Sequence, residues 1–323
     1  MNPDMIETDK SLRIGTRGSE LALVQARATM AALATVFPKL EIEQSIIKTT
    51  GDRRTDVALA DVAKAEGVFD KGVFIKELEN ALDDGSIDIA VHSLKDLPTV
   101  LDGRFALAAV LDRAPVRDVL VTRGGAGLDA LPAGARVGTS SVRRACQVRF
   151  LRPDLDVVDL RGNVPTRLQK LASGENHDAI VLAEAGLVRL GYLPPAPPSV
   201  GAAEPFKDMP GLTAHRLAED IFYPAAGQGA IGLEIRATDQ RSRVFAESIG
   251  HAATWTRIVA EREFLRLLDA GCHTPVGVFS SLADGVLHMR ARVFPNGGGE
   301  PRGGVATGTD PLETAHQLFQ SLP

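Results

Sequence analysis

The stretch LRIGT at Leu12–Thr16 is matched later in the chain by ARVGTSS at Ala135–Ser141. Each stretch is typical of a strand, and in each the apolar residues lead into Gly-Thr. Serine-containing residues follow in both places and open a predicted helix, the first from Ser19 through ELALVQARATMAAL and the second over 142–153. The repeat predicts two similar α/β domains that face each other, each with backbone N–H groups at a helix N-terminus.

The sequence after each repeat alternates between strand and helix patterns. After the first repeat we expect strands over 41–50 and 87–93, with a helix over 74–85 between them. After the second we expect strands over 155–163 and 178–186. Strand–helix–strand order at this spacing predicts a parallel or mixed sheet covered by helices.

The last third of the chain changes character. Residues 191–210 are rich in proline and small residues, which cannot build a helix or a central strand, so we expect a surface loop there. A strand over 223–236 follows. A long helix over 253–271, a hairpin over 276–294 that turns at Ala283–Gly285, and a final strand and helix then predict a small α+β domain.

Composition excludes several classes of protein. The chain has 323 residues, is 44% hydrophobic and carries a net charge of −5, which is ordinary for a soluble protein and argues against a nucleic-acid binder. The N-terminus MNPDMIETDK does not resemble a signal peptide, and the apolar runs are too short to span a bilayer. Cys146 and Cys272 lie far apart and match no metal-ligand spacing. We therefore expect a reduced, cytoplasmic protein without a metal.

The segment Ile87–Pro98, IDIAVHSLKDLP, begins as a buried strand and then places Lys95 and Asp96 side by side. Adjacent residues in extended chain point to opposite sides, so the two charges need not pair with each other. We interpret them as two groups with separate tasks at the end of a core strand.

Arginines are crowded into one region of this acidic chain. They are Arg136, Arg143, Arg144, Arg149, Arg152, Arg161 and Arg167, with Arg189 further on. Nearby acidic residues are few, so most of these guanidiniums have no obvious local partner; the alternative is a solvated helix face with surface salt bridges. Arg143 and Arg144 follow Thr139-Ser140-Ser141 at a predicted helix start, where an anion is favoured and a cation alone is not. Because arginine binds carboxylates through a two-pronged fork, we expect a small ligand with several carboxylates.

Cys272 differs from the other reactive side chains. Cys146 lies within a predicted helix and is expected to be a small buried hydrophobe, and the histidines show no metal spacing. No phosphate-binding glycine motif is present. Cys272 follows the end of the long helix, and Pro275 prevents that helix from continuing. An incidental loop cysteine is the usual interpretation, although a positive field nearby would favour a reactive thiolate.

Eight segments, in order, resemble the porphobilinogen deaminase family, also called hydroxymethylbilane synthases. They are RIGTRGSELALVQA, DKGVFIKELENAL, DIAVHSLKDLP, VGTSSVRRACQ, LRGNVPTRLQKL, AIVLAEAGLVRLG, PAAGQGAIGLE and GCHTPVG. The resemblance implies a covalent dipyrromethane cofactor, attached by a thioether to Cys272. Four porphobilinogen units are then deaminated and joined head-to-tail, and hydrolysis releases hydroxymethylbilane. The acetate and propionate arms of the pyrroles would be the carboxylates that the arginines call for.

The same resemblance assigns roles to residues. Asp96 would be the catalytic acid–base carboxylate, stabilising the methylene-pyrrole cation that remains when ammonia leaves. The binding set for substrate and cofactor would be Arg17, Ser19, Lys71, Ser93, Lys95, Thr139, Ser140, Ser141, Arg143, Arg144, Arg161, Gly162, Arg167 and Arg189. Accessory positions would be Gln25, Phe74, Asn163 and Gln228, with Lys71 and Phe74 on a mobile loop over the cleft.

The family fold implies two α/β domains of the periplasmic-binding-protein kind with a hinge, and a small α+β domain that carries the cysteine loop. We assign 1–112 with 223–247 to domain 1, 113–222 to domain 2 and 248–323 to domain 3. Porphobilinogen would be the small-molecule substrate, and we expect a monomer without nucleic-acid or membrane partners.

Three features depart from the usual family pattern. The segment from Lys64 to Lys71 is long, the proline-rich stretch Pro194–Pro210 is extended, and Ala270 stands where a glycine usually begins the cysteine loop. None of these changes removes a predicted catalytic side chain. Two alternatives keep the arginines without the chemistry: a two-lobed, non-catalytic carboxylate-binding protein, and a transcriptional effector-binding domain, for which no helix-turn-helix segment is evident.

Overall fold

A computed structural model of the chain describes residues 11–50, 75–174, 176–195, 202–206, 208–269, 274–295 and 299–323. The chain forms two compact units. Unit 1 consists of residues 1–113 and 230–256, and unit 2 of residues 114–229 and 257–323. Unit 2 thus holds both the second α/β sheet and the C-terminal sheet, and the finer division into three domains stays a prediction.

The sheet of unit 1 has the strand order β2-β1-β3-β11-β4. The bounds are β1 Leu12–Arg17, β2 Ile42–Ile47, β3 Ile89–Ser93, β4 Phe105–Val110 and β11 Ile231–Arg236. Strand β1 pairs in parallel with β2 and β3, whereas β11 pairs antiparallel with β3 and β4. A strand from late in the chain therefore lies beside the strand that precedes Lys95 and Asp96.

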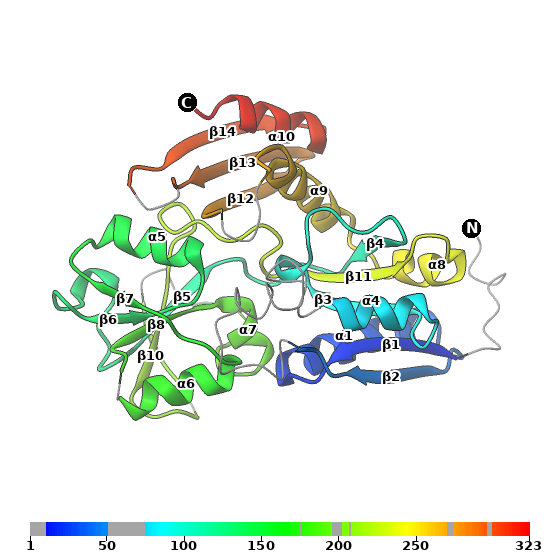
Figure 1. The fold of residues 1–323 in the computed structure, drawn as a ribbon, viewed down its shortest axis with the longest axis horizontal. Helices are drawn as coiled ribbons and strands as arrows, with labels where there is room; N and C mark the ends of the chain where they lie inside the picture. Colours follow the sequence, from blue (N-terminus) through cyan, green and yellow to red (C-terminus); the bar gives the residue numbers. More distant parts are fainter. Residues whose placement is uncertain are drawn as a thin grey trace. The chain divides into compact units, whose positions relative to one another are not determined.

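Helices cover both faces of this sheet (Figure 1). One face packs against α1 (Glu20–Val36) and α8 (Gln240–Ser248), and the other packs against α4 (Lys76–Asp83). Helix α1 begins where the sequence predicts, because the hydroxyl of Ser19 accepts a hydrogen bond from the amide of Ala22 at 3.4 Å.

The first sheet of unit 2 has the order β7-β6-β8-β5-β10-β9. The bounds are β5 Asp118–Arg123, β6 Arg136–Gly138, β7 Asp156–Val158, β8 Ala179–Ala183, β9 Ala203–Pro205 and β10 Leu212–Arg216. Strand β6 pairs in parallel with β7 and β8, and β8 pairs antiparallel with β5. This arrangement repeats that of β1 between β2 and β3, with β11 beyond, so the similarity expected from the sequence repeat extends to the topology.

Helices α5 (Val142–Leu151) and α6 (Val164–Ser173) lie on opposite faces of this sheet (Figure 1). A short helix, α7 (Glu184–Arg189), follows β8 directly. Asn163 begins α6 by accepting a hydrogen bond from the amide of Thr166 at 2.9 Å.

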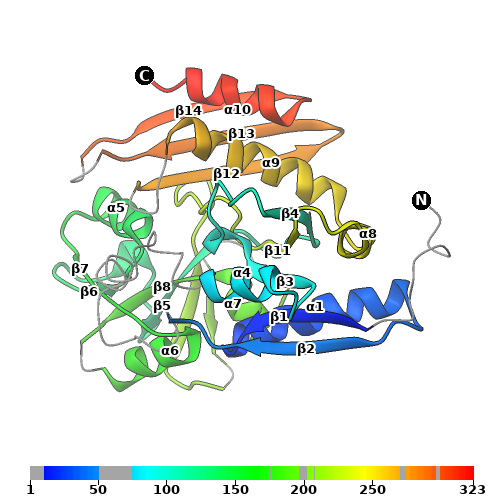
Figure 2. The same ribbon diagram turned by 45° about the vertical axis from the view of Figure 1, so that its right-hand side comes forward.

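The C-terminal sheet is antiparallel and has three strands, β12 (Val276–Ala283), β13 (Val286–Val293) and β14 (Arg302–Gly308). The hairpin turns where predicted: Asp284 and Gly285 have φ angles of 52° and 76°, which a two-residue type I′ turn requires. Helix α10 (Pro311–Gln320) runs along these strands, as Figure 2 shows, and α9 (Ala252–Leu267) packs on the same core.

The structure corrects several predicted elements. The predicted strand over 178–186 ends at Ala183, and its second half is the start of α7. The strand over 155–163 is only three residues long. The proline-rich stretch holds the short strand β9, which is tolerated because β9 lies at the edge of its sheet.

Candidate active site

Asp96 lies on a turn that leaves the centre of the unit 1 sheet. Strand β3 ends at Ser93, and a single 3₁₀ turn over Leu94–Asp96 follows. The buried Leu94 anchors this turn, whereas Lys95 and Asp96 are half-buried. Among the described residues, none forms a hydrogen bond or ion pair with the carboxylate of Asp96. That carboxylate is therefore available to a cationic or N–H-bearing ligand.

Ser93 and Gln25 form a polar contact beside this turn. The Ser93 hydroxyl lies 2.9 Å from both the amide nitrogen and the amide oxygen of Gln25, which is buried on α1. Arg17 occupies the last position of β1, and Ser19 begins α1. Two predicted site residues are thus in direct contact, and the predicted donors of unit 1 occur at the carboxyl ends of parallel strands or just beyond them.

Arg143 and Arg144 share one carboxylate, that of Asp118. Nη1 of Arg143 lies 2.7 Å from Oδ2, and Nη2 of Arg144 lies 2.7 Å from Oδ1. The three side chains are at most 7% exposed. Burial lowers the pKa of Arg143, although the charge of Asp118 acts in the opposite direction. The cluster of two cations and one anion holds an excess of positive charge in a place that water hardly reaches.

Arg143 and Arg144 were expected to lack an obvious local acidic partner, and their partner Asp118 is distant in the sequence. Asp118 begins β5, outside the arginine-rich span, and the antiparallel pairing of β5 with β8 brings it to the start of α5. The signal that could have revealed it is a charged residue at the head of the apolar run VLV. A role of the two arginines toward a ligand stays a prediction.

Three hydroxyl residues lead into α5, and their side chains bind within the protein. The amide of Ser141 donates to the Thr139 hydroxyl at 3.2 Å, and the Ser140 hydroxyl donates to the carbonyl of Leu160 at 2.6 Å. The Ser141 hydroxyl accepts from the amide of Arg144 as the N-cap. These bonds order the loop at the N-terminus of α5, the end of a helix that attracts anions.

The guanidinium of Arg161 has a nitrogen that forms no hydrogen bond with the described residues. Its Nη1 is buried and has no hydrogen-bond partner among the described residues, which is unusual for a charged donor. Gly162 follows with a φ of 123°, and a Cβ there would lie 2.9 Å from the side chain of Thr166. The carbonyl of Gly162 accepts from Nε of Arg167 at 2.6 Å, so this glycine links Arg161 to the start of α6.

Arg189 is a second incompletely paired cation. It ends α7, and its Nη2 donates to the carbonyl of Gly229 at 2.7 Å. Burial lowers the pKa of Arg189 to about 10, and among the described residues no carboxylate offsets this loss of water. A ligand carboxylate would supply that missing charge.

Gln228 supports the arginine cluster. This fully buried side chain donates from Nε2 to the carbonyl of Val116 at 2.7 Å and to Oδ1 of Asp118 at 3.0 Å. Its Oε1 accepts from Nη2 of Arg143 at 3.5 Å. The accessory position predicted from the sequence thus contacts the cluster from within the protein.

Several predicted site residues lie outside the described residues. They are Cys272, Lys71 and Phe74. The long segment from Lys64, the proline-rich residues 196–201 and Ala270 also lie outside them. The roles predicted for these residues stay predictions. Cys146, by contrast, is described: it is a half-buried free thiol on α5, and burial raises its pKa.

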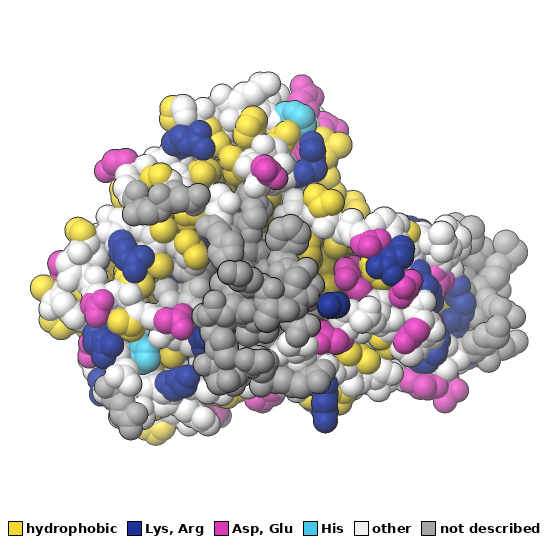
Figure 3. Space-filling model, in the orientation of Figure 1, with side chains coloured by type: hydrophobic (Ala, Val, Ile, Leu, Met, Phe, Trp, Pro, Cys, Tyr) yellow, Lys and Arg dark blue, Asp and Glu magenta, His cyan; other side chains and the backbone are white. Residues whose placement is uncertain are grey.

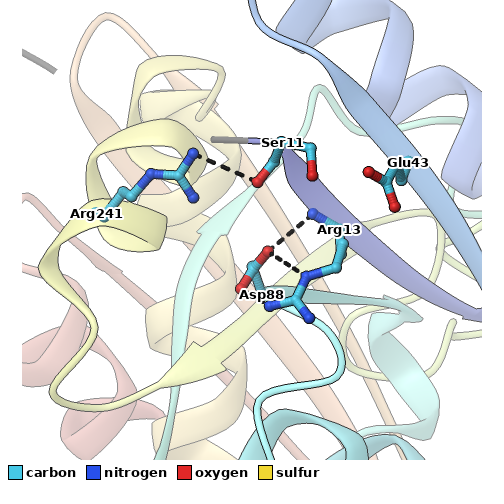
Figure 4. Close-up of a pocket in the computed structure, with 5 residues that line it drawn as sticks. All are labelled: Ser11, Arg13, Glu43, Asp88 and Arg241. Carbon is cyan, nitrogen blue, oxygen red and sulfur yellow. Dashed lines mark hydrogen bonds and ion pairs between the residues drawn. The ribbon is translucent and has the colours of Figure 1, made fainter. Parts of the chain in front are cut away.

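A separate surface pocket of about 500 Å³ lies in unit 1 (Figure 4). One of its two arginines is already paired, because the Arg13 guanidinium lies 3.0 and 3.2 Å from the two carboxylate oxygens of Asp88. This hydrogen bonding raises the pKa of Arg13. The pocket is also lined by Ser11, Glu43 and Arg241, and none of the predicted site residues takes part in it.

Among the described side chains on the face drawn in Figure 3, Lys and Arg are interspersed with Asp and Glu and form no continuous basic patch. Within the described ranges, no group of three His, Cys, Asp or Glu side chains is arranged to hold a metal ion. No described helix combines the length and apolar character needed to cross a membrane.

Comparison with known proteins gives a consistent result. Residues 12–244 match the family described as porphobilinogen deaminase, dipyromethane cofactor binding domain, and residues 255–322 match the porphobilinogen deaminase C-terminal domain. The chain is 43% identical over 286 residues to the porphobilinogen deaminase of Syntrophobacter fumaroxidans, covering 88% of this chain and 85% of the relative. It is 43% identical over 329 residues to that of Sphingopyxis alaskensis, covering 99% and 96%.

Two of the matching solved structures are distant in sequence. The periplasmic aliphatic sulphonate binding protein SsuA from Escherichia coli matches with a TM-score of 0.41 and 13% identity, covering 80% of this chain and 70% of that one. An arginine-specific periplasmic binding protein from Salmonella typhimurium matches with a TM-score of 0.40 and 11% identity, covering 77% and 97%.

Proposed function

The chain belongs to the porphobilinogen deaminase family, and from this premise we propose that Asp96 is the acid–base carboxylate with which it deaminates porphobilinogen. The protein is a transferase of tetrapyrrole biosynthesis that produces hydroxymethylbilane. The observation that supports the assignment of Asp96 is its half-buried carboxylate, which follows a core strand and has no partner among the described residues.

The chemistry of the substrate suits such a carboxylate. Porphobilinogen carries an aminomethyl group, and deamination breaks the bond between its carbon and nitrogen and releases ammonia. Positive charge develops on the pyrrole as the nitrogen leaves. A carboxylate held in a partly dry site stabilises that charge and accepts a hydrogen bond from the pyrrole N–H. It can also transfer a proton, and such acid–base catalysis raises the rate by roughly 10²- to 10⁴-fold.

The donors of unit 2 fit a polycarboxylate ligand. Within the described part of the chain, Arg161 has a buried nitrogen without a hydrogen-bond partner, and Arg189 is desolvated without a carboxylate beside it. We therefore propose these two as the main binders of the acetate and propionate groups of substrate and cofactor. The other proposed binding residues are Arg17, Ser19, Lys71, Ser93, Lys95, Thr139, Ser140, Ser141, Arg143, Arg144, Gly162 and Arg167, with Gln25, Phe74, Asn163 and Gln228 as accessory positions.

The dipyrromethane cofactor would be held through Cys272. When bound, it supplies the pyrrole carbon onto which new units are joined. The cluster of Arg143, Arg144 and Asp118 contains two cations and one anion, so it carries an excess of positive charge. A polycarboxylate would fit that excess. The same group of donors would have little use for a neutral or cationic cofactor.

Intact mass spectrometry of the purified protein tests the function directly. We expect an excess mass equal to two porphobilinogen units less their ammonias, which should disappear in Cys272→Ser. Cys146→Ser is the matched control, because that thiol lies within α5, and it should keep the excess mass. An unmodified wild-type protein from cells supplied with porphobilinogen would favour a non-catalytic carboxylate-binding protein.

We further propose that the protein acts as a cytoplasmic monomer without nucleic-acid or membrane partners. The free thiol of Cys146 and the net charge of −5 support this proposal. Light scattering at working concentration should give the mass of a single 34.3 kDa chain.

A further inference from the structure

Glu234 is a buried carboxylate in the middle of the unit 1 sheet. Its side chain is fully buried on β11, and its Oε2 lies 2.9 Å from Nε2 of His92, whose side chain is 4% exposed. The other oxygen, Oε1, is buried and has no hydrogen-bond partner among the described residues. His92 is therefore the side-chain partner that the structure gives Glu234, and it stands one residue before the end of β3.

The register of the sheet explains how the two side chains meet. His92 lies opposite Gly232, and Glu234 lies opposite Ala90. Because Gly232 has no side chain, the imidazole can reach the diagonal neighbour on the same face of the sheet. A shift in the pairing of β11 with β4 falls between Leu233 and Glu234, and such irregularities re-aim side chains.

Strand β11 also supports the turn that carries Asp96. The amide of Leu94 donates to the carbonyl of Ala230 at 3.1 Å. The Leu94 side chain occupies the space that Gly232 leaves empty: a Cβ on Gly232 would lie only 2.7 Å from Leu94 Cδ1. The 3₁₀ turn is thus supported by a hydrogen bond to Ala230, the residue before β11, and by packing against Gly232 of β11, just beyond the pair formed by His92 and Glu234.

Stability does not explain why this place holds a carboxylate. Taking a carboxylate out of water is costly, and well-packed apolar residues in place of a buried pair are often as stable or more stable. A directional bond between two neighbouring strands, however, restricts the position of the strand end more tightly than apolar packing does. The pair lies on the sheet face covered by α4, where Glu79 is a further acidic group, and the charge of Glu234 raises the pKa of Glu79 while that of His92 lowers it.

We propose that Glu234 is a positioning residue for Asp96: its bond to His92 holds the end of β3 so that the following turn presents the carboxylate in its working direction. This inference rests on the assignment of Asp96 as the acid–base group. Glu234 itself touches neither substrate nor cofactor in this scheme, so its removal should impair turnover more than binding.

The experiment compares Glu234→Leu and Glu234→Gln in the full-length, cofactor-loaded enzyme. The leucine cannot bind His92, whereas the glutamine keeps an oxygen that can accept from Nε2–H. We expect the leucine variant to lose kcat by roughly 10- to 100-fold, since small misplacements of a reacting group cost about that much, with KM changed by less than about threefold. The glutamine variant should keep most of the wild-type kcat.

Glu247→Gln, on the exposed side of α8, is the matched control and should leave both constants unchanged. If Glu234→Leu does not fold, Glu234→Asp takes its place. The aspartate keeps the charge but is one methylene too short to reach His92, so the same loss of kcat with little change in KM is expected. A wild-type kcat in the deciding variant, or equal losses in the leucine and glutamine variants, would overturn the proposal.

Asp96→Asn, measured in parallel, separates the two proposals. If Asp96→Asn keeps wild-type turnover, the assignment of Asp96 is wrong, and the positioning role falls with it. If Asp96→Asn is inactive while Glu234→Leu turns over normally, only the positioning role is wrong.

Discussion

Asp118 Oδ1 lies 2.7 Å from Nη2 of Arg144, while its Oδ2 lies 2.7 Å from Nη1 of Arg143, so one buried carboxylate holds two adjacent arginines. Asp118 is the first residue of β5, and this strand thereby orders the N-terminus of α5. The carbonyl of Val181 accepts from Arg144 at 3.0 Å and completes the support from β8. The positive end of this helix and the arginine pair are therefore held in one rigid arrangement.

Asp118→Asn should destabilise the protein severely. The variant leaves two buried guanidiniums without their counter-charge, and breaking a buried pair typically costs about 3–5 kcal/mol. Urea denaturation should show the loss as a lower free energy of unfolding. Asp178→Asn is the control: its carboxylate is 47% exposed and 3.6 Å from Arg123, so we expect a loss below about 1 kcal/mol. Equal losses in the two variants would contradict the central role of Asp118.

Arg189→Gln should weaken substrate binding without weakening the fold. Because burial lowers the pKa of Arg189, the charged form is disfavoured in the folded protein, and removing the charge should leave the free energy of unfolding unchanged or raise it. A hydrogen bond to a charged group contributes about 1.5–3 kcal/mol, so KM should rise roughly 10- to 100-fold.

Arg302→Gln removes the same charge from an exposed position on β14 and should leave KM unaltered. A wild-type KM in Arg189→Gln would show that Arg189 does not bind a substrate carboxylate.

Asp96→Asn should nearly abolish turnover while the protein still folds. The amide cannot move a proton or balance a positive charge, so kcat should fall by roughly 10²- to 10⁴-fold. Hydroxymethylbilane formation by the cofactor-loaded variant measures this. Asp102→Asn, an exposed carboxylate that pairs with Arg104, should behave like the wild type in the same assay. Retained turnover in Asp96→Asn would mean that another group carries the acid–base step.

Glu79→Gln should make the protein more stable at neutral pH. Burial, and then the charge of Glu234, raise the pKa of Glu79, so the folded state binds its proton more tightly than the unfolded state does. Ionised Glu79 destabilises the folded state. This destabilisation is absent below the pKa that Glu79 has in the unfolded chain, and it grows as the pH rises through the higher pKa of the folded protein.

Thermal melts at several pH values should therefore show a gain for Glu79→Gln near pH 7 that disappears in acid. We expect the gain to be below about 1 kcal/mol, because the group is only half-buried. A gain in stability that grows as the pH falls would show that the pKa of Glu79 is not raised in the folded protein.

The repeat of Arg-x-Gly-Thr shows how far local sequence reaches. Gly15 and Gly138 occupy equivalent places in β1 and β6, and a Cβ at either would lie within 2.5 Å of a neighbouring side chain. Strand β1, the serine N-caps at Ser19 and Ser141 and the turn at Asp284–Gly285 are also where the sequence predicts them. These features depend on residues a few positions apart, and periodicity and capping report on such neighbours.

The short strand β7 and the helix α7 were harder to predict. The predicted strand over 178–186 includes Glu184 and Ala185 after the apolar run, and the chain leaves the sheet at Ala183 and turns into α7. A short apolar run is compatible with either structure, and the packing of Leu187 into the core of unit 2 decides between them.

The sequence by itself determined the family, the two α/β sheets with their small C-terminal companion, and which residues are chemically able to act. Only the tertiary structure decided which of those residues are already engaged. Asp118 lies 25 positions from Arg143, and Glu234 lies 142 positions from His92, so no local pattern could pair them. Sheet order brings these groups together, and a buried charge must find its partner wherever the strands place one.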